Sequence, residues 1–417
     1  MARSATRLIL ALFLLFVFSS TFSIALSQSA LGLAAIMFVI AAIREGHRPR
    51  VSPLRWFYLS VGLYLAWVVV RCLISDAPLE AFNYVREEWL FVIVPLSVYM
   101  FRDESRVEAV DLALSAGVIL ITIVSLAMFF VGVQWSFRDG FETIAYEFPR
   151  SRGIFTHALT FGNYMAVAGV YLLARVLTAP ETGVGWHRRL AAAGGIAGVA
   201  ATFLCNSRGP IIALFAGLFA LLWFAKGRRR WFGLAVVALA LIVAAGSPGI
   251  RGRFTQEVKR NLNAQWPGSR LFIWEHSALV ARENLLIGTG PGKFRDTYAA
   301  SLPPNVPPER WYTHAHNDLL NVASVFGIPG LFVFVLMWVA ALFAVGRARQ
   351  WAGPETWARS AATAALVASL VFFVSSLTEA TFVDEEVRAL LMLVWGVGMA
   401  AGYKNDGGPV AASGLTT

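Results

Sequence analysis

Charged residues are scarce in this sequence. Asp, Glu, Lys and Arg make up 14% of the chain and 57% of its residues are hydrophobic, whereas a soluble globular domain carries about 25% charged residues. Apolar runs such as LILALFLLFVFSS (8–20) and LGLAAIMFVIAAI (31–43) follow one another closely, and in series they are long enough to span a bilayer. The composition excludes a soluble globular protein and predicts a polytopic membrane protein.

Cysteines and a signal-cleavage site are also largely missing. The two cysteines, Cys72 and Cys205, lie near the ends of apolar runs and are too few for a disulfide framework or a zinc cluster. We interpret them as small apolar packing residues and leave open whether they ever pair. No A-x-A site separates the first apolar run, which follows Arg3 and Arg7, from the second. We therefore expect the first run to remain as a membrane span.

What the sequence does contain is a series of apolar stretches separated by charged clusters. Their lengths predict an all-α polytopic membrane protein with about twelve transmembrane helices. The expected spans lie near residues 7–25, 28–43, 54–74, 85–101, 109–133, 158–178, 189–205, 208–226, 231–248, 319–345, 357–378 and 388–403.

Basic residues are unevenly distributed between the loops. REGHRPRVSPLR (44–55), KGRRR (226–230) and most other basic clusters fall on the same side as Arg3 and Arg7 when twelve spans are threaded. Because Lys and Arg concentrate in short cytoplasmic loops, we predict that both termini are cytoplasmic. This distribution accounts for the net charge of +10 without nucleic acid as a partner.

One connection is much longer than the others and is predicted to lie outside. Loops of this length are usually folded or functional. The chain is therefore expected to contain transmembrane helices 1–9 (1–248), a large outer loop with amphipathic helices (249–318), transmembrane helices 10–12 (319–403) and a cytoplasmic tail (404–417).

Within the outer loop, GSRLFIWEHSALVAREN (268–284) predicts an amphipathic helix that lies on the membrane or against the bundle. The residues at helical spacing are Leu271, Trp274, Ala278, Leu279 and Arg282.

Several arginines fall on the outer side. CNSRGP (205–210) places Arg208 in a tight outer turn, and Arg270 opens the amphipathic helix. PRSRGIFTHALTFGNY (149–164) places Arg150, Arg152 and His157 at the outer end of the span expected over 158–178. A single arginine at a helix end could simply reach the membrane interface. Several together near a histidine favour an anion site, because guanidinium groups match phosphate oxygens.

The segment WYTHAHNDLLN (311–321) leads into an apolar span. On a helix, His314 and His316 would point about 200° apart, and no further His or Cys cluster supplies more ligands, which argues against a metal site. A capping role and catalysis both remain open. A neutral histidine beside a hydroxyl is suited to act as a general base, and Asn317 or Asp318 could fix its tautomer or hold a substrate hydroxyl.

The glycine-rich segment GTGPGKF (288–294) is not interpreted as a nucleotide site. It lacks the G-x-x-x-x-G-K-[ST] spacing and the hydroxyl residue after Lys293. Its predicted outer location also separates it from cytoplasmic nucleotides.

These motifs together resemble the O-antigen ligase and polymerase superfamily, and most closely its O-antigen ligases. The resemblance covers roughly residues 150–400 and rests on the order of the pieces around one large outer loop. The matching pieces are HALTFGNY (157–164), SRG (207–209), GSR…W (268–274), HAHNDLL (314–320) and FGIPG (326–330).

The resemblance implies a GT-C-like lipid-linked glycosyltransferase architecture in the bacterial inner membrane, with the active site facing the periplasm and no metal or other cofactor. The donor would be undecaprenyl-diphosphate-linked O-antigen and the acceptor lipid A–core, with membrane lipids around them and no nucleotide. His316 would be the base, with Arg208 and Arg270 as the other catalytic residues. Substrate contacts would come from Arg152, His157, His314, Asn317 and Asp318.

Two other functions remain open at this point. An O-antigen polymerase or a protein O-oligosaccharyltransferase would share the donor chemistry and differ in the acceptor. A secondary transporter would also suit twelve spans, but such proteins place coupling residues at the bilayer midplane. Here the expected midplane stretches are almost free of ionisable residues, which favours a transferase.

Overall fold

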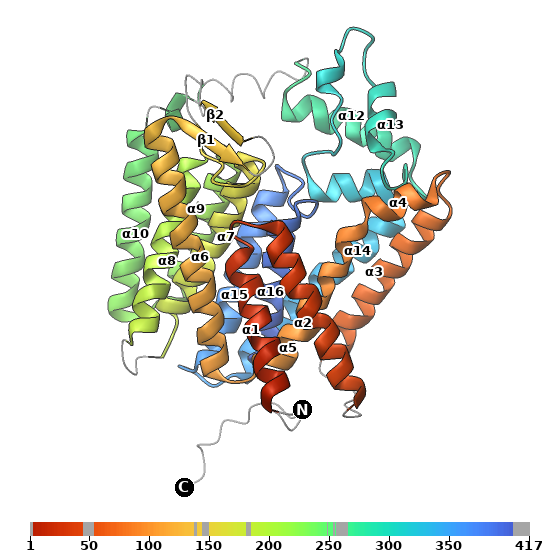
Figure 1. The fold of residues 1–417 in the computed structure, drawn as a ribbon. Coiled ribbons are helices and arrows are strands. Elements are labelled where there is room, and N and C mark those ends of the chain that lie inside the picture. The colour runs from red at the N-terminus through yellow and green to blue at the C-terminus, as the bar shows by residue number, and fades with distance from the viewer. Residues whose placement is uncertain are drawn as a thin grey trace.

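The computed structural model describes residues 3–44, 54–136, 140–143, 150–180, 185–247, 249–252, 255 and 266–402. Within these ranges the chain forms a helical bundle with a smaller helical part at one end (Figure 1). The expected tail 404–417 and part of the outer loop, including residues 256–265, lie outside the described residues.

Helices account for nearly all of the regular structure. The N-terminal half contains α1 (Arg3–Ser19), α2 (Ile24–Arg44), α3 (Arg55–Leu73), α4 (Pro78–Tyr84), η2 (Arg86–Val92), α5 (Ile93–Met100), α6 (Glu104–Val131), α7 (Ala158–Leu177) and α8 (Trp186–Leu204). The remainder contains α9 (Arg208–Phe224), α10 (Gly227–Gly246), α12 (Arg270–Glu283), α13 (Phe294–Ala300), η3 (Pro308–Arg310), α14 (Asp318–Trp351), α15 (Trp357–Ser376) and α16 (Glu385–Ala400).

The all-α polytopic membrane class is confirmed. Seven helices in the described residues are long and apolar enough to cross a membrane, and two shorter apolar helices accompany them. Every one of the twelve expected spans overlaps helical residues, although 85–101 is divided between the 3₁₀-helix η2 and α5. The expected number of twelve transmembrane helices and the orientation of the termini stay predictions.

A β-hairpin was not expected from the sequence. Strands β1 (Val133–Ser136) and β2 (Gly140–Thr143) pair in antiparallel register after α6. Gly132, in the left-handed conformation at φ 74°, ends α6 and turns the chain into β1, because glycine adopts this conformation without steric cost.

The helix predicted over 268–284 is confirmed as α12, and whether its predicted face lies on the membrane stays a prediction. The residues that α12 buries are Phe272, Ile273, Ser277, Val280 and Ala281. Leu271 and Leu279, which belong to the predicted face, are 40% and 39% exposed. The face that packs against the protein thus differs from the predicted apolar face, which is left available for contact with the membrane.

α14 is bent rather than straight, which corrects the single span expected over 319–345. Gly327 has φ 70° and ψ −176° inside the helix, and Pro329 follows it. The freed backbone is bonded elsewhere: Trp67 Nε1 donates to Phe326 O at 2.8 Å, and Ile328 N donates to Leu285 O at 2.8 Å. Figure 1 shows the first part of α14 crossing beneath α12 before the helix descends.

The centre of the bundle is formed by α7, α15 and α16, which are the most completely buried helices. The start of α7, the end of α15 and the starts of α9 and α14 all lie at the end of the bundle that carries α12 and α13 (Figure 1). We call this the loop end. Polar residues at these termini therefore meet at the edge of the apolar core.

Candidate active site

His316 lies at the loop end in an unusual backbone conformation. Its φ is 49°, a left-handed value that is uncommon for a residue with a side chain and costs of order 1–3 kcal/mol. Two contacts hold it there: His316 N donates to His314 Nδ1 at 3.3 Å, and Trp274 Nε1 donates to His316 O at 3.2 Å. His314 and Trp274 therefore fix the backbone of His316 and direct its imidazole toward the turn between α15 and α16.

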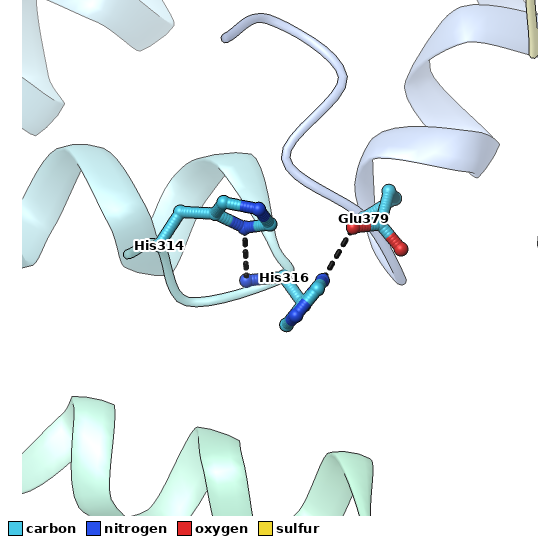
Figure 2. A group of neighbouring side chains, drawn as sticks. All are labelled: His314, His316 and Glu379. Carbon is cyan, nitrogen blue, oxygen red and sulfur yellow. Dashed lines mark hydrogen bonds and ion pairs between the residues drawn. The ribbon is translucent and has the colours of Figure 1, made fainter. Parts of the chain in front are cut away.

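The imidazole of His316 is joined to a carboxylate that the sequence did not single out. Glu379, in the turn between α15 and α16, is hydrogen-bonded through Oε1 to His316 Nδ1, as Figure 2 shows. Its Oε2 accepts from the Arg270 guanidinium at 2.7 Å. The Glu379 side chain is 8% exposed. Two of the three predicted catalytic residues therefore converge on one buried carboxylate.

The charges around Glu379 decide its protonation state. Burial by itself would raise the pKa of Glu379, but the hydrogen bond from His316 and the positive charge of Arg270 lower it to about 2. The carboxylate is therefore ionised at neutral pH. Burial and the neighbouring charge of His316 lower the pKa of His314 to about 4, so His314 is neutral under the same conditions.

An ionised carboxylate at Nδ1 determines what His316 can do chemically. Glu379 can only accept a hydrogen bond, so Nδ1 carries the proton and donates it to Oε1. Nε2 then holds the free lone pair. A carboxylate that orients a histidine in this way is the arrangement found where imidazole acts as a general base.

Arg208 begins α9 beside the turn that carries Glu379. A Cβ placed on the next residue, Gly209, would lie 2.9 Å from Thr378 Oγ1, and Thr378 immediately precedes Glu379. The preceding residue, Ser207, has no capping hydrogen bond to α9, because its hydroxyl donates to Cys205 O at 3.0 Å. The first turn of α9 thus keeps N–H groups at its positive end, a common anion-binding feature.

Asn317 and Asp318 hold the site together from within the protein. Asn317 caps α14 by accepting from Leu320 N at 2.9 Å and donates to Leu377 O at 2.9 Å. Asp318 is 2% exposed and accepts from Phe382 N at 3.0 Å. These contacts tie the start of α14 to the turn that carries Glu379 and favour a positioning role, while the predicted substrate contact stays a prediction.

Arg152 and His157 precede α7, and neither has a hydrogen bond to Glu379 among the described contacts. Arg152 forms an ion pair with Glu142 of β2 at 3.0 Å. His157 precedes α7 without capping it and is exposed. Its charge acts on the pKa of His314, which it helps to lower. His157 is therefore close enough to the His314–His316 segment for an electrostatic influence, whereas Arg152 is used in the hairpin contact.

Helical geometry does not argue against a metal site in the folded chain, because the two histidines lie before α14. His314 and His316 precede α14 and are not on a helix; their ring centroids are 4.2 Å apart. With Glu379 they offer three ligand atoms within 4.8 Å of one another. Arg270 at 2.7 Å from Glu379 would repel a bound cation, so the predicted absence of a metal stays a prediction that chelation can test.

Sequence reasoning missed Glu379 although a signal was present. TEATFVDEEVR (378–388) contains four acidic residues between two apolar helices. A charged turn next to the membrane is usually solvated. Contacts with His316 and Arg270, 63 and 109 positions away in sequence, distinguish Glu379 from the other three.

Comparisons with known proteins give a family match, which covers several of the motifs. No curated protein matches the chain at a significant level. A family model described as O-antigen ligase matches residues 193–335, a region that includes Arg208, Arg270 and His316. Residues 193–335, about a third of the chain, are therefore similar to the O-antigen ligase family, which is consistent with a member of the O-antigen ligase and polymerase superfamily.

Proposed function

We propose that the protein transfers O-antigen from undecaprenyl diphosphate to a sugar hydroxyl of lipid A–core at the periplasmic face of the inner membrane. The observation that supports this most is the convergence of His316 and Arg270 on the ionised carboxylate of Glu379. It provides a base and a cation side by side, within the region matched by the O-antigen ligase family model.

The proposed reaction is a single displacement. The acceptor hydroxyl oxygen attacks the anomeric carbon of the first O-antigen sugar, and the bond from that carbon to the diphosphate oxygen breaks. The hydroxyl proton passes to His316 Nε2 while Glu379 keeps Nδ1 protonated. One displacement inverts the anomeric carbon and requires no covalent intermediate.

The diphosphate leaves as an anion and needs charge stabilisation more than a proton. Arg270 is 27% exposed beside Glu379, and Arg208 lies at the positive end of α9. Cationic donors fixed before the reaction are commonly worth about 3–4 kcal/mol each to such a step. We assign the leaving diphosphate to Arg208, Arg270 and the first turn of α9.

The orientation of the chain belongs to the same proposal. The basic clusters at the end opposite the loop end support a cytoplasmic location for that end, which leaves Glu379 and His316 at the periplasmic face. Cysteine substitutions at the exposed Glu309 and at the exposed Arg189 would separate the two orientations. A membrane-impermeant thiol reagent should label only the first in intact spheroplasts.

The function is tested by reconstituting the purified protein with the lipid-linked donor and lipid A–core. We expect glycosylated lipid A–core to form at the same rate with and without EDTA. Loss of the product on chelation would replace the base mechanism with a metal-dependent one at His314, His316 and Glu379.

A deletion strain separates the ligase from the polymerase. Loss of the ligase leaves bare core and accumulated lipid-linked polymer, whereas loss of a polymerase leaves core with a single repeat. The second pattern would contradict the proposed acceptor and retain the donor chemistry.

A further inference from the structure

A second polar pocket lies at the opposite end of the bundle from Glu379. It is bounded by the starts of α6, α8 and α15 and by the end of α7, and it opens outward from an enclosed volume of about 40 Å³. The charged residues that line it are Glu104, Glu108, Asp111, Arg175 and Arg188.

Two of these charges are used within the protein. Arg175 Nε donates to Asp111 Oδ2 at 2.8 Å, and Arg175 also donates to Trp357 O at 3.1 Å. Asp111 accepts a further bond from Tyr171 at 3.1 Å. This pair forms the satisfied floor of the pocket and joins α6 to α7.

Arg188 is different, because one of its nitrogens is buried without a hydrogen-bond partner. A buried guanidinium N–H that is left unpaired is costly. Arg188 belongs to the first turn of α8 and lines the pocket. The arrangement provides a donor that an acceptor inside the pocket would satisfy.

The other charges around Arg188 specify what kind of acceptor fits. Arg229 and Arg175 are the cations that act electrostatically on it, and Glu104 and Glu108, which also line the pocket, are the anions. An anion alone would meet the carboxylates of Glu104 and Glu108; Glu108 lies 3.9 Å from His187 Nδ1. A ligand with a phosphate and an adjacent ammonium group satisfies both signs at once.

The pocket also lies where a membrane lipid would reach it. Trp357 lines its wall, and Trp186, which starts α8, is 62% exposed. Tryptophan is enriched at the membrane–water interface, and polar pockets between helices at that level bind lipid headgroups.

We propose that this pocket binds the phosphoethanolamine headgroup of a membrane phospholipid, with the phosphate on Arg188 and the ammonium group beside Glu104 and Glu108. The proposal concerns a site separate from Glu379 and does not depend on the proposed function. The lipid holds α6, α7 and α8 together at the interface.

The test is native mass spectrometry of the purified full chain titrated with single phospholipids. We expect phosphatidylethanolamine to bind at least about fivefold more tightly than phosphatidylglycerol or phosphatidylcholine. Arg188→Ala should weaken phosphatidylethanolamine binding about tenfold or more, since a charge-assisted hydrogen bond is lost. Arg188→Lys keeps the charge and should retain the preference.

Arg189→Ala is the matched control, because Arg189 is the neighbouring exposed arginine and does not line the pocket. It should bind phosphatidylethanolamine like the native chain. Equal binding by the Arg188→Ala and Arg189→Ala variants, or tighter binding of phosphatidylglycerol, would overturn the proposal. If free phosphoethanolamine displaces the phospholipid at equal concentration, the ligand is a soluble ester and the lipid assignment is wrong.

Thermal unfolding distinguishes a variant that loses binding because it misfolds from one that loses a contact with the headgroup. Glu108→Gln removes a partly exposed charge and should leave the unfolding midpoint unchanged. It should reduce the preference for phosphatidylethanolamine over phosphatidylglycerol by at least about threefold, since the ammonium group loses a partner. An unchanged preference would count against the assigned orientation of the headgroup.

Discussion

Two carboxylates in this protein have basic partners, and their surroundings differ. Asp111 and Arg175 are 9% and 7% exposed, and both are bonded further to Tyr171 and to Trp357 O. Glu379 is equally buried, but its partners His316 and Arg270 are 13% and 27% exposed. Asp111 closes a contact between helices, whereas Glu379 holds two reactive groups at a surface.

The comparison shows how a stabilising ion pair and a candidate catalytic group can be told apart. Removing one member of a closed, buried pair leaves an uncompensated charge and lowers stability. Removing an exposed partner of Glu379 should lower activity with little loss of stability.

His316→Ala should have the largest effect on activity. It removes the proposed base, and general-base catalysis typically contributes about 10²–10⁴-fold. Alanine tolerates the strained backbone at φ 49° slightly less well than histidine, so the unfolding midpoint should fall only a little. The measurement is the initial rate of glycan transfer at saturating donor.

His276→Ala is the control for His316→Ala. His276 lies on α12 and contacts Phe272 and Tyr298 rather than Glu379. It should transfer glycan at the native rate. Comparable losses in both variants would remove the case for a specific base.

Asp111→Asn tests the closed pair. Breaking a buried ion pair by removing one partner costs about 3–5 kcal/mol, so the unfolding midpoint in detergent should fall sharply. Asp103→Asn provides the comparison, because Asp103 is 49% exposed and asparagine can replace it as the cap of α6. An equal, small shift in both variants would contradict the structural role of Asp111.

Arg270→Ala should reduce transfer by about 10²–10³-fold, since one fixed cationic donor to the leaving group is lost. Arg282→Ala, at the exposed last turn of the same helix, should keep the native rate. The measurement is kcat with the native donor. A rise in KM with an unchanged kcat would show that Arg270 only binds the donor.

Gly288→Ala should have the smallest effect, and it should act on stability. Gly288 has φ 68°, and a Cβ would lie 2.3 Å from Val325 O, where the loop is bonded to the bend of α14. We expect a loss of about 1–3 kcal/mol. Gly292→Ala shares the positive φ, but its Cβ meets only Tyr84 at 3.9 Å, so it should cost less. Equal shifts in the unfolding midpoint would contradict the close contact.

The sequence predicted the helices well and the details of their ends less well. Apolar length depends on neighbouring residues alone, so α2, α6 and α15 follow from hydropathy. The bend at Gly327 depends on bonds to Trp67 and to residues before α13, which no local pattern contains.

The candidate site was predicted in part. His316, Arg208 and Arg270 were found because their motifs resemble a family, and the structure brings His316 and Arg270 to one carboxylate. Glu379 was missed because its partners are distant in sequence. The metal argument assumed a helix at His314, whereas the helix starts at Asp318.

The central claim is that Glu379 acts through His316, and a double-mutant cycle of transfer rates tests it most directly. Glu379→Gln should reduce transfer at least about tenfold in the native chain, because the amide no longer fixes the imidazole as a base. In the His316→Ala background the same substitution should have less than about a threefold effect, since the two residues act as one unit. An equal loss in both backgrounds would contradict the claim.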